Sequence, residues 1–225
     1  FMLCNPHNPV GRVFDRDELG RIAALAERHD LVICSDEIHC GLVLDPATPH
    51  TPIAALGDAV ARRTITLMAP SKTWNIPALY CAFAIIPDAA LRARYKRAMA
   101  GIVPHVNVLG LVATEVAYRD CDPWRQALLD TLRGNAARVA RVINGLPGLV
   151  TTPVEATYLA WIDCRGLLAA RGITNAAAFF EAAGVGLSDG KDFGLPGFVR
   201  LNFGCPPQRL EAALERIRHA VMATG

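Results

Sequence analysis

Lys72 is the residue of this sequence whose type and position most clearly suggest chemistry. It lies in the stretch Ala69-Pro-Ser-Lys-Thr-Trp-Asn75, between an apolar run at 64–68 that predicts a β-strand and a second apolar run at 80–86. A lysine at the carboxyl end of a strand lies where α/β proteins place reacting groups. Its amine becomes a nucleophile when its surroundings lower its pKa, and it then forms a Schiff base with a carbonyl group. Since most lysines that follow a strand are solvated, this stretch alone also fits an exposed loop residue.

Two other polar residues follow predicted strands in the same part of the chain. Asn8 lies in the loop Asn5-Pro-His-Asn-Pro-Val-Gly11, and Asp36 comes directly after the apolar run 31–35. Each residue alone would be read as a turn or cap residue. Together with Lys72 they supply the groups that a pyridoxal phosphate site needs: an amine for the aldehyde, a carboxylate for the pyridine nitrogen and an amide donor for the phenolic oxygen. The three residues therefore predict a pyridoxal phosphate site.

The elements that must position these residues alternate along the first part of the chain. Residues 1–4, 31–35 and 64–68 read as strands, and Asp15 with Glu18 forms a capping pattern that opens a helix to about His29. We expect Leu19, Ile22, Ala23, Leu25 and Ala26 on the apolar face of this helix. Strands that alternate with helices indicate an α/β fold with a mostly parallel sheet between helices.

The alternation of predicted strands and helices ends after Pro87. Helices are predicted at 88–100, 106–118 and 122–144, followed by shorter units that include strands at 158–163 and 198–203 and helices near 166–170, 174–183 and 208–222. We therefore expect a large domain over 1–121, a long interdomain helix over 122–145 and a small α+β domain over 146–225.

Composition limits the partners and the compartment. The 225 residues are 52% apolar and 20% charged, with a net charge of +2 and no run of like charges, so neither nucleic acid nor a membrane surface is an expected partner. No apolar stretch reaches the roughly 18 residues of a membrane span. The seven cysteines are scattered without a C-x-x-C pair, which indicates reduced thiols and a cytoplasmic protein. Asp36, His39 and Cys40 form a poor ligand set for zinc, so no metal is expected.

Four motifs then agree in order and spacing with a known family. Asn5-Pro-His-Asn-Pro-Val-Gly11, Ser35-Asp-Glu-Ile-His39 and Ser71-Lys-Thr-Trp-Asn75 resemble the successive signatures of class I/II pyridoxal-phosphate aminotransferases of fold type I. Within that family, Asp-Glu-Ile-His and Ala-Pro-Ser-Lys-Thr-x-Asn resemble the cystathionine β-lyase-like C–S lyase branch. Val199-Arg-Leu-Asn-Phe-Gly204 resembles the segment that carries the arginine for the substrate carboxylate. The resemblance covers essentially the whole chain and implies part of a fold type I large domain followed by a small α+β domain.

The resemblance also implies roles for single residues. Asn8 would contact the phenolic oxygen of the cofactor and Asp36 its pyridine nitrogen. His39 takes the place of a tyrosine that touches the same phenolic oxygen in most aminotransferases. Lys72 would hold the cofactor through a Schiff base and move the Cα proton. Arg200 would pair with the substrate carboxylate, since a guanidinium binds carboxylates with two parallel hydrogen bonds; without the resemblance, a strand-end salt bridge is an equally good reading of Arg200.

The chain departs from the family pattern around the phosphate. Many relatives have a phosphate-binding serine where this chain has Ala69, and an arginine after the lysine where residues 75–80 offer none. Ser71 is left as a candidate phosphate contact. The family's glycine-containing helix N-terminus for the phosphate, and the aromatic residue that stacks on the ring, would both lie before Phe1. We therefore expect the chain to be the carboxyl-terminal part of a longer protein and to hold the cofactor weakly by itself.

The implied activity is a C–S β-lyase reaction on cystathionine or cysteine S-conjugates, which yields pyruvate, ammonia and a thiol. Lys72 would serve equally in an aminotransferase that passes an amino group to a 2-oxo acid, and this alternative stays open. A non-catalytic, effector-binding module is a third possibility. The family also implies a homodimer, and the apolar helix at 106–118 would suit burial.

Overall fold

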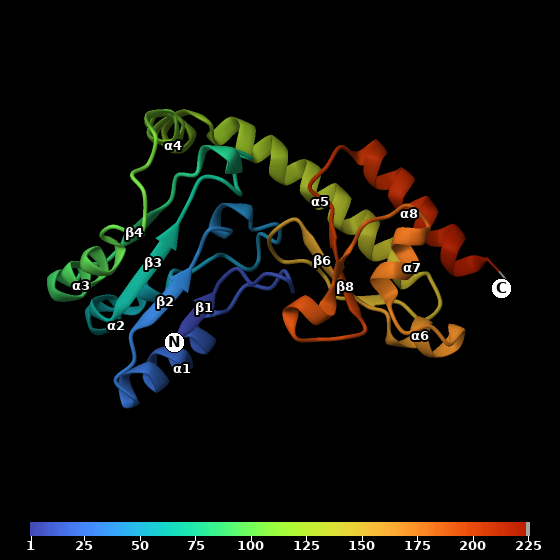
Figure 1. The fold of residues 1–225 in the computed structure, drawn as a ribbon, viewed down its shortest axis with the longest axis horizontal. Helices are drawn as coiled ribbons and strands as arrows, with labels where there is room; N and C mark the ends of the chain where they lie inside the picture. The colour runs from blue at the N-terminus through green and yellow to red at the C-terminus, as the bar shows by residue number, and fades with distance from the viewer. Residues whose placement is uncertain (224–225) are drawn as a thin grey trace. The chain divides into compact units, whose positions relative to one another are not determined.

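The computed structural model describes residues 1–223, and its contacts divide the chain into two compact units (Figure 1). The first unit comprises Phe1–His7 and Arg12–Ala127, and the second comprises Asn8–Gly11 and the residues from Leu128 onward. Helix α5 (Asp122–Asn144) begins in the first unit and continues into the second. Its bounds are those expected from the Asp-Pro start and the Gly145 stop. The short loop that contains Asn8 therefore belongs by its contacts to the second unit.

A four-stranded sheet forms the centre of the first unit, which confirms the expected α/β class. Its order is β1 (Met2–Cys4), β2 (Ile33–Asp36), β3 (Thr64–Met68) and β4 (Phe83–Ile85). The first three strands are parallel and β4 runs antiparallel to β3, so the sheet is mixed. In the register, Asp36 lies beside Cys4 on one side and Leu67 on the other. The carboxyl ends of three parallel strands thus meet at one edge of the sheet.

Helix α1 (Arg16–Arg28) packs its apolar stripe against this sheet. Asp15 and Glu18 form the capping box expected from the sequence, each side chain bonding the other's backbone N–H. Leu19 and Ala26 of the helix share a buried cluster with Leu3 and Ile33 of the strands. The prediction for Leu25 was wrong: its side chain is 49% exposed, because it lies at the border of the helix stripe and faces away from the sheet.

The remaining elements of the first unit are short, apart from two helices that follow β4. Turns η1 (Cys40–Leu42), η2 (Ile53–Leu56) and η3 (Pro77–Leu79) and helix α2 (Asp58–Arg62) connect the strands. Asp88 caps α3 (Ala89–Met99) and Asn107 caps α4 (Val108–Asp120) through side-chain bonds to the backbone of the first turn. Helix α4 buries only Gly110 and Ala117 and leaves most of its large apolar side chains exposed.

The second unit has its own sheet, in which every strand pair is antiparallel. The order is β5 (Val150–Thr151), β6 (Leu159–Asp163), β8 (Phe198–Asn202) and β7 (Ser188–Asp189). Besides α5, the unit contains α6 (Arg165–Arg171), α7 (Ala176–Ala182), turn η4 (Gly190–Phe193) and α8 (Pro207–Met222). Antiparallel strands with separate helices make this unit α+β.

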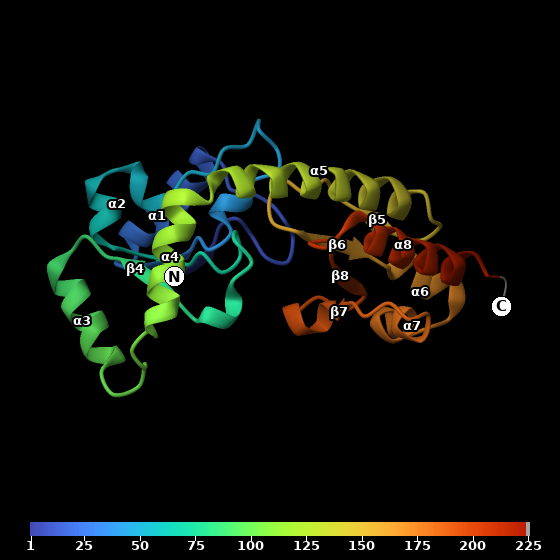
Figure 2. The ribbon, with the colours of Figure 1, turned by 90° about the horizontal axis from the view of Figure 1, so that it is seen from above.

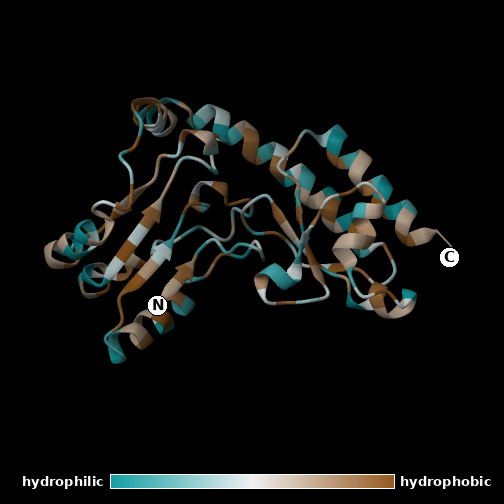
Figure 3. Cartoon of the chain, in the orientation of Figure 1, coloured by the Kyte–Doolittle hydropathy of each residue, from teal (hydrophilic) through white to brown (hydrophobic). Residues whose placement is uncertain are grey.

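Helix α8 lies beside α5 within the second unit (Figures 1 and 2), where Arg138 Nε is 2.8 Å from Glu211. Teal and brown residues alternate along α8 in Figure 3, as in a helix with one buried face. Its buried residues are Leu210, Leu214, Ile217 and Val221. Among the helices of residues 1–223, none is long and apolar enough to cross a membrane.

Candidate active site

The end of strand β2 is fixed to both neighbouring strands by main-chain bonds. The N–H of Asn5 donates to the Asp36 carbonyl at 3.0 Å, and the N–H of Glu37 donates to the Leu67 carbonyl at 3.0 Å. The Asp36 side chain is half-buried, and its Oδ1 accepts a bond from the N–H of Ile38 at 3.2 Å. The backbone around Asp36 is therefore held on both sides, while its carboxylate keeps acceptor capacity for a further donor.

His39 lies in the turn that follows Asp36 and is buried. It precedes η1, and its carbonyl accepts a bond from the N–H of Leu42 at 2.9 Å. Cys40 follows, and burial, with a further contribution from the Glu37 carboxylate, raises the pKa of the Cys40 thiol to about 11. The Cys40 side chain is thus a neutral packing group rather than a nucleophile.

Lys72 lies in a tight turn after β3. The N–H of Trp74 donates to the Pro70 carbonyl at 2.9 Å, and the N–H of Ile76 donates to the Ser71 carbonyl at 3.2 Å. The indole N–H of Trp74 donates to the Cys121 carbonyl at 3.2 Å, which ties the turn to the end of α4. Lys72 itself is half-buried, and its amine makes no hydrogen bond or ion pair with any other residue of the described chain. That amine is available to a ligand.

The turns after β2 and β3 pack directly on each other. A Cβ added to Gly41 would lie 2.6 Å from Thr73 Oγ1 and 2.7 Å from its Cγ2, so only glycine leaves room for the buried Thr73. Thr73 is the residue after Lys72, and Gly41 is two residues after His39. The structure therefore brings Asp36, His39, Ser71 and Lys72 to one edge of the first sheet.

A hollow of about 420 Å³ adjoins this edge within the first unit. Its lining includes Asp36, Leu67, Phe83, Tyr95 and Met99, so it lies along β3 and β4 below α3. Lys72 is not among its lining residues. Asp36 therefore borders an open, mainly apolar space in this unit.

A buried polar cluster behind Asp36 was not anticipated from the sequence. Glu37 is 1% exposed, and its carboxylate accepts a bond from Ser35 Oγ at 2.9 Å and lies 2.9 Å from His50 Nε2. His50 Nδ1 is buried and has no hydrogen-bond partner among the described residues. Glu37 stands next to Asp36 in the quoted motif, but the sequence holds no signal that pairs it with His50, 13 residues away.

Arg200 and Asn8 meet in the second unit. Arg200 Nη1 donates to Asn8 Oδ1 at 2.8 Å, and Arg200 Nη2 donates to Ser188 Oγ at 3.1 Å. The N–H groups of Glu155 and Ala156 both bond the Gly11 carbonyl, which fixes the loop of Asn8 in this unit. Because Oδ1 of Asn8 is occupied by Arg200, its Nδ2 is directed to other partners as a donor. Burial lowers the pKa of Arg200, with an opposing contribution from Tyr158.

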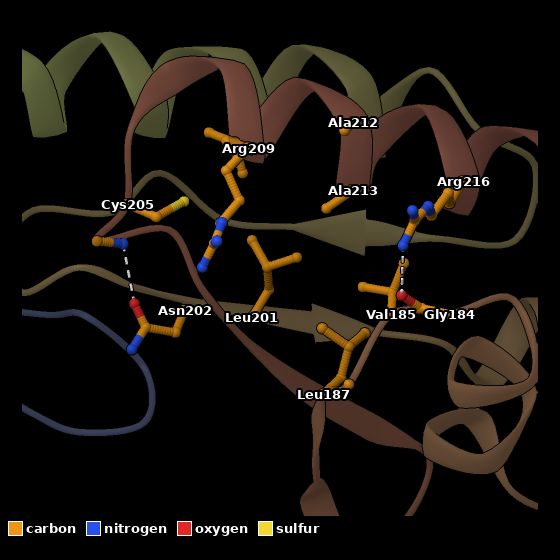
Figure 4. Close-up of a pocket in the computed structure, with 13 residues that line it drawn as sticks. Gly184, Val185, Leu187, Leu201, Asn202, Cys205, Arg209, Ala212, Ala213 and Arg216 are labelled. Atoms are coloured by element: carbon orange, nitrogen blue, oxygen red, sulfur yellow. Dashed lines mark hydrogen bonds between the residues drawn. The ribbon is translucent and has the colours of Figure 1, made fainter.

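Another hollow, of about 760 Å³, lies in the second unit beside α8 (Figure 4). Apolar residues such as Leu187 and Leu201 form part of its lining, and Arg209 and Arg216 project from α8. Arg216 Nη1 donates to the Gly184 carbonyl at 3.0 Å. None of the predicted site residues lines this hollow.

Comparison with known proteins identifies the family. The model of the family described as aminotransferase class I and II matches residues 1–217. The chain belongs to this family. Among curated relatives, cystathionine beta-lyase PatB of Bacillus subtilis is 34% identical over 98% of the chain. Among solved structures, OvoB is 50% identical with a TM-score of 0.96 over the whole chain. The PLP-bound C–S lyase of Staphylococcus hominis is 30% identical with a TM-score of 0.91 over 99% of the chain.

The chain spans only part of each of these class I and II relatives. It covers 58% of the length of PatB, of OvoB and of the Staphylococcus hominis lyase. The similarity at these identities confirms the expected family and its fold.

The residues present suit pyridoxal phosphate, the cofactor that the Staphylococcus hominis lyase binds. In the first unit, an amine without a partner and a carboxylate with acceptor capacity lie at neighbouring strand ends. In the second unit, Arg200 Nε is buried without a hydrogen-bond partner among the described residues, so this donor can bind an anionic ligand. Amine, carboxylate, amide and guanidinium form the donor set that the cofactor and an amino acid require.

Proposed function

We propose that this protein is a pyridoxal-phosphate-dependent C–S β-lyase. It would act on cystathionine or related cysteine S-conjugates and release pyruvate, ammonia and a thiol. The observation that carries the proposal is the half-buried Lys72 amine, without a partner, in a turn packed against the turn that follows Asp36. The names of PatB and of the Staphylococcus hominis lyase support the lyase reaction for this arrangement.

The roles of the residues follow from their chemistry. Pyridoxal phosphate, when bound, would supply an electron sink for negative charge at the substrate Cα. Lys72 would hold its aldehyde until the amine of the substrate replaces it, and the freed Lys72 amine would then take the proton from Cα. Asp36 would keep the pyridine nitrogen protonated, because a carboxylate favours the charged form of a neighbouring base. Expulsion of the thiolate from Cβ completes the elimination, and water then hydrolyses the remaining three-carbon enamine to pyruvate and ammonia.

The other residues of the site would orient the reactants. Asn8 would donate from its Nδ2 to the phenolic oxygen, and the bond that its Oδ1 accepts from Arg200 supports this role. His39 would contact the same phenolic oxygen, and Ser71 would donate to the phosphate. Arg200 would bind the substrate carboxylate and so restrict the orientation of the substrate.

An aminotransferase is the second candidate, and the name of the matched family supports it. Both reactions begin with removal of the Cα proton, and they differ in their outcome: an aminotransferase passes the amino group to a 2-oxo acid, whereas a lyase loses the thiolate from Cβ. Purified protein supplied with cystathionine distinguishes them. Release of pyruvate and thiol when no 2-oxo acid has been added as an acceptor supports the lyase. Amino transfer to a 2-oxo acid without pyruvate release would replace it with the aminotransferase, and absence of both reactions would contradict both catalytic candidates.

A second copy of the chain would cover the exposed face of α4. Val108 and Leu109 are 70% and 68% exposed, Leu111 and Val112 both 54%, and Tyr80 beside them is 84% exposed. Asn107 Nδ2 bonds the Leu79 carbonyl at 2.9 Å, so this apolar surface is continuous from η3 to α4. Contiguous apolar patches of this kind mark protein–protein contacts. A homodimer is therefore part of the proposal.

The proposed compartment is the cytoplasm. All seven cysteines, each within the described residues, are free thiols, and Cys81 and Cys164 are buried. Free thiols of this number suit a reducing environment.

A further inference from the structure

An aromatic ring and a hydroxyl group hold the guanidinium of Arg200 in the second unit. On β8, Arg200 lies directly between Trp161 of β6 and Ser188 of β7. The ring of Phe193, the last residue of η4, has its centroid 4.7 Å from Arg200 Cζ. Ser188 Oγ accepts a bond from Nη2 at 3.1 Å. The ring restricts the plane of the guanidinium and the hydroxyl restricts its rotation in that plane.

Phe193 is itself held in place. Its ring meets Trp161 edge to face, with centroids 5.6 Å apart, and Trp161 is buried and stacks on Phe198 at 5.4 Å. Turn η4 sits tightly on β8, because a Cβ at Gly190 would lie 2.6 Å from the Phe198 carbonyl oxygen. The Phe193 ring is 36% exposed, but its contact with Trp161 and the close packing of η4 on β8 hold it over Arg200.

One nitrogen of the Arg200 guanidinium is left without any acceptor. Nη1 bonds Asn8 and Nη2 bonds Ser188, whereas the buried Nε has no hydrogen-bond partner among residues 1–223. A buried donor without an acceptor is unfavourable, so an anion that supplies one gains affinity. Nε and Nη2 form one edge of the guanidinium, and a carboxylate can bond both at once.

We propose that Phe193 and Ser188 are positioning residues that hold Arg200 so that this edge receives the substrate carboxylate. The inference rests on the proposed function for the identity of the carboxylate, an amino acid. Because the guanidinium is already oriented, less side-chain freedom is lost when the carboxylate binds. Phe193→Leu keeps an apolar side chain but removes the aromatic face that attracts the cation. Ser188→Ala removes the bond that fixes the rotation of the fork.

The first test measures carboxylate binding without the reaction. The chain is labelled with ¹⁵N, and the Arg200 Nε–H resonance, assigned by its loss in Arg200→Lys, is followed during titration with 3-(methylthio)propanoate, a carboxylate that has no amine. We expect a saturable shift in the wild type and a dissociation constant about three- to tenfold higher in Phe193→Leu and in Ser188→Ala. Phe179→Leu is the matched control, since Phe179 is half-buried against Phe180 and remote in sequence from Arg200. Thermal unfolding of each variant confirms that it is folded.

The second test separates positioning from mere support of the fold. In the active enzyme, both variants should raise KM for cystathionine by a similar factor and leave kcat nearly unchanged, and Phe193→Tyr should restore KM. Carboxylate affinity and KM equal to those of the wild type, in either variant, would overturn the inference. A wild type that binds the carboxylate through Arg200 but releases no pyruvate would refute the proposed lyase function and leave the positioning role intact.

Discussion

At the scale of single residues, the candidate site depends on a buried support that does not itself reach the ligand. Glu37 follows Asp36 and is buried between Ser35 and His50. A buried carboxylate is tolerated only when donors surround it, and its loss of partners is strongly destabilising. The Ser35–Glu37–His50 cluster therefore anchors the main chain from which Asp36 and His39 project.

His50→Ala tests this anchor. We expect it to lower the free energy of unfolding by about 3 kcal/mol, because the buried Glu37 side chain would lose its contact with His50 and retain only its bond from Ser35. Chemical denaturation at neutral pH measures the change. His105→Ala is the control, since His105 is exposed, and it should be nearly neutral. Equal small effects of both substitutions would show that the cluster contributes nothing to the anchor.

At the scale of elements, the two turns that carry Asp36 and Lys72 are fitted to each other at Gly41. The close approach of Thr73 leaves no space for a Cβ at this position. Gly41→Ala should destabilise the protein by about 1–3 kcal/mol and displace the Lys72 turn.

A double-mutant cycle tests the fit of these turns. Thr73→Ala removes the two atoms nearest to the added Cβ, so the double variant should recover about 1 kcal/mol relative to the sum of the single changes. Gly20→Ala on α1 is the control; nothing lies within 4 Å of its Cβ, and it should be neutral or stabilise the helix by up to about 1 kcal/mol. Strict additivity of Gly41→Ala and Thr73→Ala would contradict the packing described.

The elements themselves were largely predictable from local signals. The capping box at Asp15 and the long helix α5 follow from residues within each segment, and their bounds agree with the structure. Strand β2 begins two residues later than the run 31–35 suggests, because Leu31 and Val32 lie partly exposed before the ladder starts. Each of these features depends on neighbours in the sequence.

The contacts of Ser188 and Phe193 with Arg200 could not be predicted from such local signals. Ser188 lies on a two-residue strand and Phe193 ends a four-residue turn, so neither element has a periodic pattern. Their contacts with Arg200 arise from strand register and aromatic packing between segments. Such pairings depend on the tertiary fold and cannot be predicted from a single sequence. The roles of Asn8, Asp36, His39, Ser71, Lys72 and Arg200 remain predictions.

At the scale of the whole molecule, buried thiols lower the free energy of unfolding as the pH rises into the alkaline range. Burial raises the pKa of Cys164 to about 12, with a smaller contribution from the Asp163 carboxylate. Between pH 9 and 12 the unfolded thiol loses its proton and the folded thiol keeps it, so stability falls as pH rises. Below pH 9 both states are protonated and Cys164 adds no pH dependence.

Cys164→Ala should therefore reduce the loss of unfolding free energy above pH 9 by up to about 1.4 kcal/mol per pH unit. Denaturant titrations at pH 8, 10 and 11 measure the slope, and the value at pH 8 corrects for the cavity that the substitution leaves. An unchanged alkaline slope would contradict the assignment to this thiol.

The exposed face of α4 makes a second prediction at this scale. Leu109→Asp should convert a dimer into a monomer, because it places a charge in the apolar surface while an acidic residue in the first turn suits the helix dipole. Light scattering coupled to size exclusion measures the mass. Leu25→Asp, at an exposed apolar position on α1, should leave the mass unchanged. A wild type that is monomeric at high concentration would refute the dimer.

The most direct measurement of the central claim is covalent trapping on the lysines. The sequence contains three, Lys72, Lys96 and Lys191, of which Lys96 and Lys191 are exposed. The chain is incubated with pyridoxal phosphate, reduced with borohydride, digested and mapped by mass spectrometry, beside Lys72→Ala. The account predicts preferential modification of Lys72 and no gain at the other two lysines in the variant. Equal modification of all three lysines, or none at Lys72, would contradict it.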